Sequence, residues 1–462
     1  MNGHLSRRVL GATLAMASAL AVTACAPTHP SIVPATAPLT AYSTGAATAP
    51  LTAYSTSSDP GVTPQSPAGS ATPQSPVGSA TTLGALSPSG LMGTATPSGA
   101  TPSPASVAAA ASSPILLYAQ DWNSYPATRT TAAWQEAAVT HEVLVGSPGK
   151  VYGNMIAQLH AWNPELKVLV YDLGPYTQSG ASEYATLMTE HPDYFARNAA
   201  GNLITVKAAG GSPAFAKNTL MNEGNPGWQA WEAQRVASNI AKWGFDGAYI
   251  DSMGAGPFSG TTTGVPINPS TGQAYTEAQW MEASGQTLDV IKAAIGSKYL
   301  FSTGLVNGIA YQKDTHYLAD STVNGVQTNS WMRVSDTSLT QWPSPSLLAS
   351  DLAMVQSLQA QGKAFFAWTN VWTTATPAQV SAWNTYALAA YLLVDNGVND
   401  YYTFDSPFDS DRTTIFNPSE LAALGAPTGS FTLTGGVYSR NFRNGSVTLN
   451  TTTNAAAIDV TQ

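Results

Sequence analysis

Residues 243–254 read WGFDGAYIDSMG, and this stretch decides the fold. The small and apolar residues from Gly247 to Ile250 are followed at once by a carboxylate, Asp251. A short apolar run bounded by turn residues is typical of a buried strand. Only 10% of the 462 residues are charged, so an acid at the end of such a strand needs a structural explanation.

Eight apolar runs of this kind follow residue 114, and helical stretches separate most of them. The runs cover residues 115–123, 141–146, 167–174, 247–252, 299–308, 324–333, 363–372 and 400–406. Helices are predicted over residues 151–162, 182–198, 225–243, 277–295, 346–361 and 376–397. The clearest is 225–243, because Asn225 suits the N-cap, Pro226 suits the first helical position, and apolar residues recur at helical spacing.

This alternation of strands and helices predicts a fold of the α/β class with a parallel sheet. Eight units in about 300 residues favour a (β/α)8 TIM barrel over residues 114–425. The alternative is an open, doubly wound sheet, whose nucleotide-binding version needs a glycine-rich turn after its first strand. YAQDWNSY, residues 118–125, is no such turn, so we expect the barrel.

The N-terminal 25 residues have the features of a bacterial lipoprotein signal peptide. Arg7 and Arg8 precede an apolar run at 9–22, and small residues lead to Cys25, the only cysteine. VTAC at 22–25 resembles a lipobox, in which the cysteine is lipidated and becomes the new N-terminus. We therefore expect a chain that is lipid-anchored through Cys25 to the extracellular face of the bacterial cell membrane. The alternative is an ordinary cleaved signal.

Residues 26–113 are rich in Ala, Thr, Ser, Pro and Gly, with no Lys or Arg and one acid, Asp59. ATAPLTAYST occurs twice, at 35–44 and at 47–56. Such a segment buries too little apolar area to offset the entropy of ordering it. We predict a disordered tether that holds the folded part away from the membrane, with no membrane contact other than through Cys25.

Composition and motifs exclude several classes of partner and cofactor. A net charge of −9 gives no electrostatic basis for binding nucleic acid. The six His residues are scattered without an HExxH motif, and no phosphate-binding loop or serine-hydrolase elbow is present, so no cofactor and no metal are predicted. DSPFDSDR, residues 405–412, offers oxygens for Ca²⁺, but we favour a solvated acidic loop. We expect a monomer.

In a (β/α)8 barrel, the chemistry lies at the carboxyl ends of the strands. The residues found there are carboxylates, amides, tryptophans and one arginine: Asp121, Trp122, Asp172, Asp251, Asn307, Asn329, Trp331, Arg333, Trp368, Asn370, Trp372 and Asp405. Acids and amides form hydrogen bonds with hydroxyl groups, and Trp faces stack on the apolar faces of pyranose rings. We therefore predict a polysaccharide or oligosaccharide substrate.

A glycosidase needs two carboxyl groups, one to protonate the leaving oxygen and one to attack the anomeric carbon or activate a water. Asp251 is the best candidate for the nucleophile or base, and the alternative is an aspartate that caps the next turn. Arg333 either binds a substrate carboxylate or pairs with a nearby Asp. Asp246 is expected at the bottom of the barrel, and Glu232 is expected on a solvated helix face.

GFDGAYIDSM, residues 244–253, resembles the strand-four motif of several barrel glycosidase families, in which Gly-Phe-Asp-Gly precedes a catalytic Asp. More narrowly, residues 114–450 resemble the bacterial group known as hypothetical glycosyl hydrolase 15. The supporting segments are ILLYAQDW, NPGWQAW, GFDGAYIDSM, LVNG, NGVQTNSWMR and GGVYSRNFRNGSVTLN. The resemblance implies a barrel that acts on polysaccharide through Asp251, followed by a small C-terminal β-strand domain at 426–462.

One departure from this pattern concerns the proton donor. The resemblance implies a Glu or Asp near the end of strand five or six. FSTGLVNG and VQTNSWMR contain no acid, and Asn329 stands about where one is expected. The donor is then Asp172, Asp405 or Asp121, in that order, or a loop residue such as Glu223, or it is lost.

We therefore predict a glycoside hydrolase in which Asp251 works with Asp172 as its leading partner. The first alternative is a catalytically inactive barrel that serves as a tethered carbohydrate-binding surface protein, and the missing strand-six acid favours it. The second alternative is an adhesin or wall-spacing protein without a sugar site, which the Trp-rich mouth disfavours.

Overall fold

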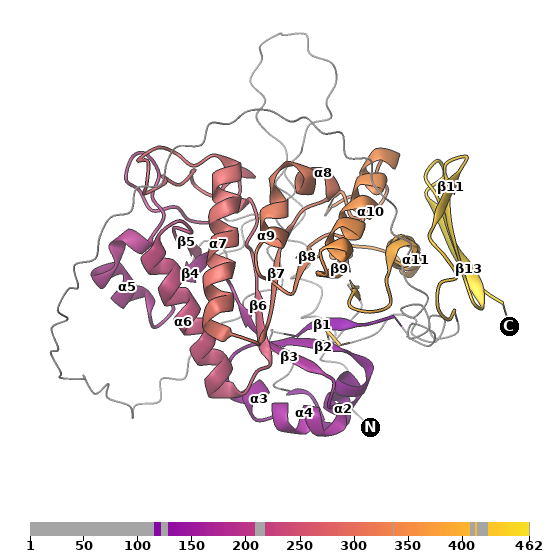
Figure 1. Cartoon of the computed structure of the whole chain (residues 1–462), viewed down its shortest axis with the longest axis horizontal. Coiled ribbons are helices and arrows are strands. Elements are labelled where there is room, and N and C mark those ends of the chain that lie inside the picture. The colour runs from indigo at the N-terminus through magenta and orange to yellow at the C-terminus, as the bar shows by residue number, and fades with distance from the viewer. Residues whose placement is uncertain are drawn as a thin grey trace, which may run out of the picture. The chain divides into compact units, whose positions relative to one another are not determined.

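The computed structural model describes residues 115–121, 128–207, 218–335, 337–406, 412–413 and 424–461. The predicted signal peptide with Cys25, the predicted tether and Trp122 lie outside these residues. The described chain forms an eight-stranded parallel sheet with helices around it, followed by a four-stranded antiparallel sheet (Figure 1). Within those ranges, the structure contains no helix of the length and apolar character that a membrane span requires.

The eight parallel strands form the ring that the sequence predicts. They are β1 (Tyr118–Asp121), β2 (Val143–Gly146), β3 (Lys167–Asp172), β6 (Gly247–Ile250), β7 (Tyr299–Leu305), β8 (Gly325–Thr328), β9 (Ala364–Asn370) and β10 (Tyr401–Asp405). Neighbours pair in this order. The ring is closed by a parallel bridge between Leu117 and Tyr402, and the Tyr402 N–H donates to the Leu116 carbonyl at 2.9 Å. The predicted barrel is confirmed, because an open sheet would leave these two edges apart.

Helices cover the outside of the barrel. They are α2 (Thr131–Thr140), α3 (Lys150–Gly153), α4 (Ile156–Trp162), α6 (Pro226–Trp243), α7 (Glu277–Ile295), α8 (Gly308–Ala310), α9 (His316–Asp320), α10 (Pro345–Ala360) and α11 (Pro377–Val394). The Asn225 side chain accepts hydrogen bonds from Gly227 N and Trp228 N, so the predicted cap of α6 is confirmed. The predicted helix at 151–162 is split into α3 and α4 around Asn154.

The segment between β3 and α6 contains less helix than expected. The helix predicted over 182–198 is shortened to α5 (Tyr184–Glu190), followed by a single 3-10 turn, η2 (Pro192–Tyr194). Pro192 has no N–H with which to continue α5, and a residue before proline disfavours the helical region. His191 has left that region, with φ at −134°.

Two antiparallel sheets accompany the barrel. β4 (Tyr176–Gln178) and β5 (Asn218–Leu220) pair within the β3–α6 connection, which the sequence does not predict. At the C-terminus, β11 (Thr432–Thr434), β12 (Val437–Phe442), β13 (Gly445–Asn450) and β14 (Ala455–Val460) form one sheet. The Arg440 guanidinium donates to the carbonyls of Leu392 at 2.7 Å and Asp395 at 2.9 Å, which joins this sheet to the end of α11.

Alternate residues of each barrel strand face either the interior or the helices. The interior is filled mainly by aromatic side chains, with aliphatic residues such as Leu169 between them; the aromatic ones are Tyr118, Tyr171, Tyr249, Phe301, Phe366, Trp368 and Tyr401. The positions between them, such as Val170, Ala248 and Ile250, belong to the core between strands and helices. The face on which a strand-end side chain lies therefore follows from its place in this alternation.

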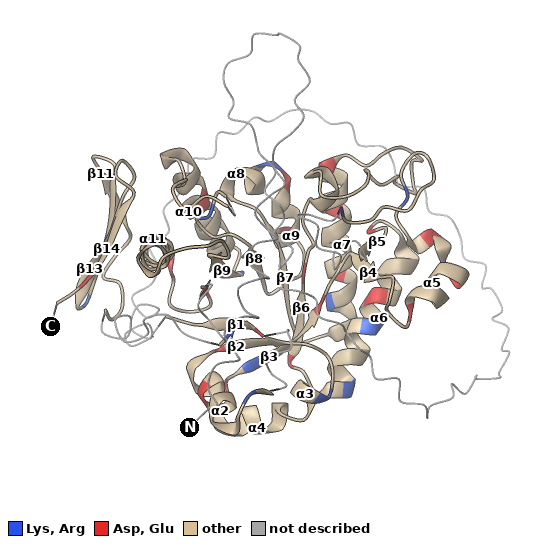
Figure 2. Ribbon diagram, turned by 180° about the vertical axis from the view of Figure 1, so that it is seen from behind, with Lys and Arg blue, Asp and Glu red and all other residues tan. Residues whose placement is uncertain are grey.

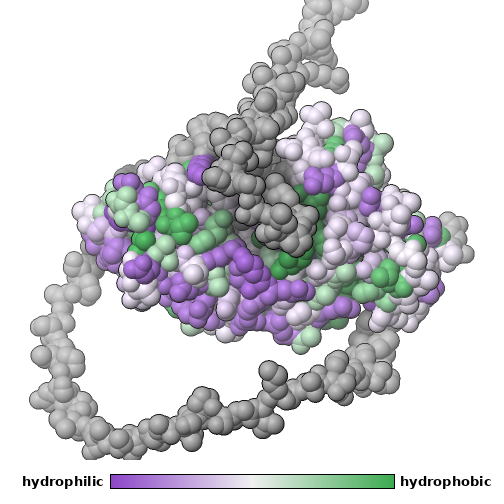
Figure 3. Space-filling view, turned by 90° about the horizontal axis from the view of Figure 1, so that it is seen from above, coloured by the Kyte–Doolittle hydropathy of each residue, from purple (hydrophilic) through white to green (hydrophobic). Residues whose placement is uncertain are grey.

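Charged residues are sparse and of mixed sign over the described elements (Figure 2). The face seen in Figure 3 combines hydrophilic with apolar residues. Asp246, which precedes β6, contacts His160 Nε2 at 2.9 Å and accepts a hydrogen bond from Val168 N at 2.8 Å. It therefore lies at the amino ends of β3 and β6, which is the bottom of the barrel as predicted.

Gly247 leaves no room for a side chain at the start of β6. A Cβ added there would lie 2.1 Å from the carbonyl oxygen of Tyr299 on β7. We predict that Gly247→Ala lowers the free energy of unfolding by about 3 kcal/mol, because the two strands must move apart. In the control Gly180→Ala, no described atom lies within 4 Å of the added carbon, and the change should stay below about 0.5 kcal/mol. Urea unfolding measures both, and equal losses would contradict the prediction.

Candidate active site

Five of the predicted residues lie on the interior face at the carboxyl ends of the strands. They are Asp251, Asn329, Trp368, Asn370 and Asp405, and all are buried. Asp251 follows the interior residue Tyr249 by two positions, and the interior residue Trp368 donates a hydrogen bond to Asp405. These side chains define what we call the mouth of the barrel.

The Asp251 carboxylate is held by three hydrogen-bond donors. Its Oδ2 accepts from the Tyr171 hydroxyl at 2.8 Å, and its Oδ1 accepts from Thr303 Oγ1 and from Ser252 N, each at 2.8 Å. Burial raises the pKa of Asp251, and the hydrogen bonds oppose this rise because they favour the charged form. The result is a carboxyl group of fixed orientation on the interior face of the barrel.

Asp405 lies at the end of β10, four strands from β6 in either direction around the ring. Its carboxylate accepts a hydrogen bond from Trp368 Nε1 at 2.9 Å and forms an ion pair with Arg412. The Arg412 guanidinium lies 5.5 Å from the ring centroid of Trp372, and Trp372 meets Trp368 edge to face at 5.2 Å. Burial raises the pKa of Asp405, while Arg412 and Trp368 lower it. Two of the predicted sugar-stacking residues thus accompany an acid.

Asp172, the predicted leading partner of Asp251, lies on the helix-facing side of β3. Its Oδ1 accepts from a terminal nitrogen of Arg235 on α6 at 2.5 Å, and the same nitrogen binds Glu232 at 2.7 Å. Glu232 is fully buried, so its expected solvated position is wrong: Arg235 provides the charge that a buried acid needs. The structure does not bring Asp172 and Asp251 together, because the two side chains lie on opposite faces of the sheet.

Asp121 also lies on the helix-facing side, at the end of β1. Both terminal nitrogens of Arg129 donate to its carboxylate, at 2.5 and 2.8 Å, and the Tyr152 hydroxyl donates at 2.5 Å. Asp121 is completely buried in this arrangement. Its predicted place among the mouth residues is therefore corrected to a structural one between β1 and α3.

Trp331 and Arg333 follow β8 but pack behind it, against α11. Trp331 is 1% exposed and donates from Nε1 to the Ala387 carbonyl at 3.0 Å. The Arg333 guanidinium lies 4.5 Å from the ring centroid of Trp383 and donates to the Ser338 carbonyl at 3.1 Å. Neither side chain reaches the mouth as predicted, because the chain turns outward after Asn329.

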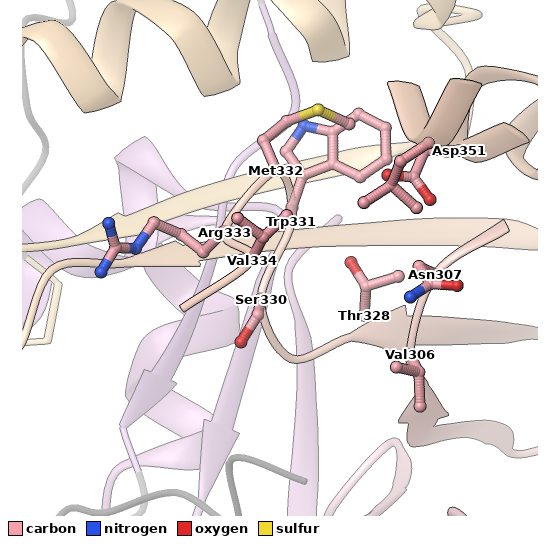
Figure 4. Close-up of a pocket in the computed structure, with 10 residues that line it drawn as sticks. Val306, Asn307, Thr328, Ser330, Trp331, Met332, Arg333, Val334 and Asp351 are labelled. Carbon is pink, nitrogen blue, oxygen red and sulfur yellow. The ribbon is translucent and has the colours of Figure 1, made fainter. Parts of the chain in front are cut away.

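Asn307 lies beside a separate small hollow, lined by residues of the β7–α8 and β8–α10 connections and of α10 (Figure 4). Its Oδ1 caps α8 by accepting from Ala310 N at 2.9 Å. Asp351 of α10 also lines the hollow, accepts from Gly308 N at 2.6 Å, and has a pKa raised by burial to about 7. Asn307 therefore stabilises the local fold, and its predicted contact with substrate gains no support from this placement.

Amides connect the mouth to the layer below it. Asn329 Oδ1 accepts from Gln327 Nε2 at 3.0 Å, and Asn370 Nδ2 donates to the Asn329 carbonyl at 3.2 Å. Gln327 Oε1 in turn accepts from the hydroxyls of Tyr118 at 2.9 Å and Tyr249 at 2.5 Å. The position at which the family resemblance implies an acid is therefore occupied by an amide of fixed orientation.

Glu223, in the connection between β5 and α6, is another buried carboxyl group. Its side chain is 0% exposed, and neither oxygen accepts a hydrogen bond within the described residues. Burial raises the pKa of Glu223 to about 7, although Thr287 and Trp228 lie close enough to oppose the rise. Burial, Asp251 and Glu223 together raise the pKa of Tyr176, so this phenol lies within electrostatic reach of both acids. Glu223 therefore retains its proton close to neutral pH.

The groups that hold the mouth acids and the amide Asn329 in place are absent from the sequence prediction. They are Tyr171, Ser252, Thr303, Gln327 and Arg412. The signal that identifies two of them is the register of the sheet, in which Tyr171 pairs with Tyr249 and Ile250 pairs with Ser302. Once Asp251 is known to face the interior, this register places Tyr171 and Thr303 beside it.

The structure also bears on metal binding. Among the residues that it describes, no group of three or more His, Cys, Asp or Glu side chains could hold a metal ion. Asp409 and Asp411 of the segment 405–412 lie outside those residues. The choice between a calcium loop and a solvated acidic loop stays a prediction.

A closed parallel barrel with buried carboxylates, amides and tryptophans at the carboxyl ends of its strands is the architecture of a barrel glycosidase. The family described as hypothetical glycosyl hydrolase family 15 matches residues 160–446. This match covers more than half of the chain, and the protein belongs to that family. No curated protein matches the sequence.

Several solved structures are similar to this chain at low identity. The noncanonic maltogenic α-amylase AmyB of Thermotoga neapolitana has a TM-score of 0.42 at 10% identity, over 72% of this chain and 84% of its own. Amy13B of Eubacterium rectale has a TM-score of 0.40 at 10% identity, over 64% and 68%. A cycloisomaltooligosaccharide glucanotransferase of Paenibacillus sp., complexed with cycloisomaltoheptaose, has a TM-score of 0.39 at 13% identity, over 56% of this chain. This chain covers only 38% of the glucanotransferase.

Glu223 makes stability depend on pH. Its pKa is raised from 4.5 to about 7, so between these values the folded chain holds a proton that the unfolded chain releases. The stabilisation is complete below the lower value and is lost as pH rises through the upper one. We predict that Glu223→Gln matches the wild type near pH 4 and exceeds its free energy of unfolding by about 3 kcal/mol near pH 8.

Urea unfolding across this pH range measures the effect. Glu165→Gln, at an exposed glutamate, is the control and should track the wild type at every pH. A difference between Glu223→Gln and the wild type that stays constant with pH would show that Glu223 titrates normally.

Proposed function

We propose that the protein hydrolyses glycosidic bonds of a polysaccharide, with Asp251 as nucleophile or base. The observation that carries the proposal is the Asp251 carboxylate itself, buried at the end of the fourth barrel strand and fixed by Tyr171, Thr303 and Ser252. A carboxylate held in this way can attack an anomeric carbon or accept a proton from water without first being reoriented. Membership of a glycosyl hydrolase family supports the same chemistry.

The remaining mouth residues and the neighbouring Trp372 suit a sugar chain. Trp372 is partly exposed beside Trp368 and offers an indole face for stacking on a pyranose ring. Asn370 and Asn329 add amide groups that can bind hydroxyls. The predicted lipid anchor at Cys25 and the tether, which stay predictions, would place this mouth outside the cell, where it would meet a polymer of the envelope or matrix.

Two carboxyl groups are candidates for the proton donor. Asp405 shares the interior face with Asp251 but is paired with Arg412, which favours its charged form. Glu223 keeps its proton near neutral pH but is fully buried, with Tyr176 within reach of both Glu223 and Asp251. Position therefore favours Asp405, and protonation favours Glu223.

A second candidate function is carbohydrate binding without hydrolysis. It is favoured by the amide Asn329, which Gln327 holds where the family resemblance implies an acid. In this case the barrel would retain the sugar-binding side chains of the mouth and lack a proton donor. The two functions differ in one measurable property, the release of new reducing ends.

Asp251→Asn tests the main proposal. On any polysaccharide that the wild type cleaves, we expect the variant to lose about 10³-fold or more in kcat while still binding the polymer, because the amide keeps the size and loses the charge. Asp172→Asn is the matched control, with the same chemical change on the helix-facing side. It should retain hydrolysis and lose stability, because Arg235 loses one of its two charged partners.

Reducing-end release on a panel of polysaccharides measures these effects. If the wild type binds a polymer without releasing reducing ends, the hydrolase proposal is wrong and the second candidate function, carbohydrate binding, takes its place. Loss of hydrolysis in Asp172→Asn equal to that in Asp251→Asn would restore the predicted pair of Asp251 and Asp172.

The proton donor is identified by leaving-group dependence. In an aryl glycoside with an acidic phenol, the phenolate leaves without being protonated. A variant that lacks the donor should therefore still cleave this substrate, while its kcat on the polysaccharide falls about 10²-fold. We compare Asp405→Asn with Glu223→Gln in both assays. If both variants cleave the polysaccharide like the wild type, neither residue is the donor.

A further inference from the structure

Ser252, directly after Asp251, has a left-handed backbone conformation. Its φ is +67°, and the other described non-glycine residues with positive φ are Met332 at +63° and Asn454 at +55°. Asn adopts this region more readily than most residues, whereas for Ser it costs conformational energy. Such strain persists only where the surrounding structure enforces it, and it is concentrated at functional sites.

Close backbone packing enforces the turn at Ser252. A Cβ added to Gly174 would lie 2.4 Å from the Asp251 carbonyl oxygen. On the other side, a Cβ added to Gly254 would lie 2.9 Å from the carbonyl oxygen of Gly304, at an irregularity of β7. The turn is therefore clamped between two glycine contacts and has no room to relax into an extended strand.

The left-handed turn directs the Ser252 N–H back toward the acid. This N–H donates to Asp251 Oδ1 at 2.8 Å and to Thr303 Oγ1 at 2.7 Å, and Thr303 Oγ1 itself donates to Asp251 Oδ1 at 2.8 Å. One strained residue thus completes a three-membered hydrogen-bond cycle around a single carboxylate oxygen. The conformation orients the carboxylate that the proposed function requires.

A glycine would adopt the same φ without strain, so the backbone alone does not explain why this residue is Ser. The hydroxyl does. Ser252 Oγ is buried, and no described residue forms a hydrogen bond with it. It nevertheless lies close enough to the Asp251 carboxylate to favour its charged form. The buried hydroxyl therefore lies beside the Asp251 carboxylate without a partner among the other described residues.

We propose that Ser252 is a positioning residue for Asp251, whose strained N–H and buried hydroxyl hold the carboxylate charged and aimed into the mouth. The expected effect on kcat rests on the proposed function. The expected effect on the charge of Asp251 does not depend on that function. The other groups that face Asp251 are Tyr171 of β3, Thr303 of β7, Tyr249 of β6 and Tyr176 of β4.

Two variants separate the hydroxyl from the backbone. Ser252→Ala removes the hydroxyl and keeps the strain, whereas Ser252→Gly removes both. We expect kcat to fall about tenfold in both variants with KM changed by less than about twofold, because a hydroxyl that favours the charged form of Asp251 is lost. We also expect Ser252→Gly to melt about 1–3 °C higher than Ser252→Ala.

Asn454→Gly is the matched control, because it relieves a left-handed residue in the turn between β13 and β14. Because Asn tolerates this region better than Ser, the change should alter the melting temperature by less than about 2 °C and leave kcat unchanged. A merely structural Ser252 would behave like Asn454. Wild-type kcat in both Ser252 variants would therefore overturn the proposal.

The electrostatic consequence is measured without activity. Asp residues labelled with ¹³C at the carboxyl carbon are titrated by NMR in the full chain, and Asp251→Asn identifies the resonance of Asp251. We expect Ser252→Ala to move the pKa of Asp251 upward by about one unit. If the pKa of Asp251 is the same in Ser252→Ala and the wild type, the proposal is overturned. If the pKa shifts but the wild type shows no hydrolysis, only the proposed function is overturned.

Discussion

Successive side chains of a β-strand lie on opposite faces of a sheet, and in a closed barrel one of these faces is the interior. This constraint sorts the acids at the carboxyl ends of the strands into two classes. Asp251 and Asp405 continue the interior series, and Asp121 and Asp172 continue the series that packs against the helices. A shift of one residue in any strand would exchange these roles.

Asp251 differs from the other three acids in how its charge is compensated, because Asp405 on the same face pairs with Arg412. The helix-facing acids are neutralised by arginines from outside the sheet, Arg129 for Asp121 and Arg235 for Asp172. Asp251 is instead surrounded by neutral donors, which fix its orientation and leave its charge uncompensated. An uncompensated buried charge destabilises a fold, so no structural role explains its presence here, and this supports the role proposed for Asp251.

Much of the barrel can be predicted from sequence, because eight apolar runs alternate with amphipathic helices that have recognisable caps such as Asn225. The position of Asp251 at a strand end is predictable for the same reason, since it directly follows the short apolar run GAYI. Asp172 is not assigned correctly, because Leu169 and Val170 are equally apolar and the run KVLVYD does not reveal which face is interior. Glu223 and Ser252 depend on contacts between distant segments, which no local pattern encodes.

The filled interior below the mouth has a consequence for how a polymer can be handled. Tyr118, Phe301 and Tyr401 pack around Phe366 with ring centroids 4.6 to 4.8 Å apart, and Gln327 ties two tyrosines together above them. No chain can thread through a cylinder plugged in this way. A polymer would therefore have to enter and leave through the same opening, at the carboxyl ends of the strands. It would either lie across this opening or insert one end into it.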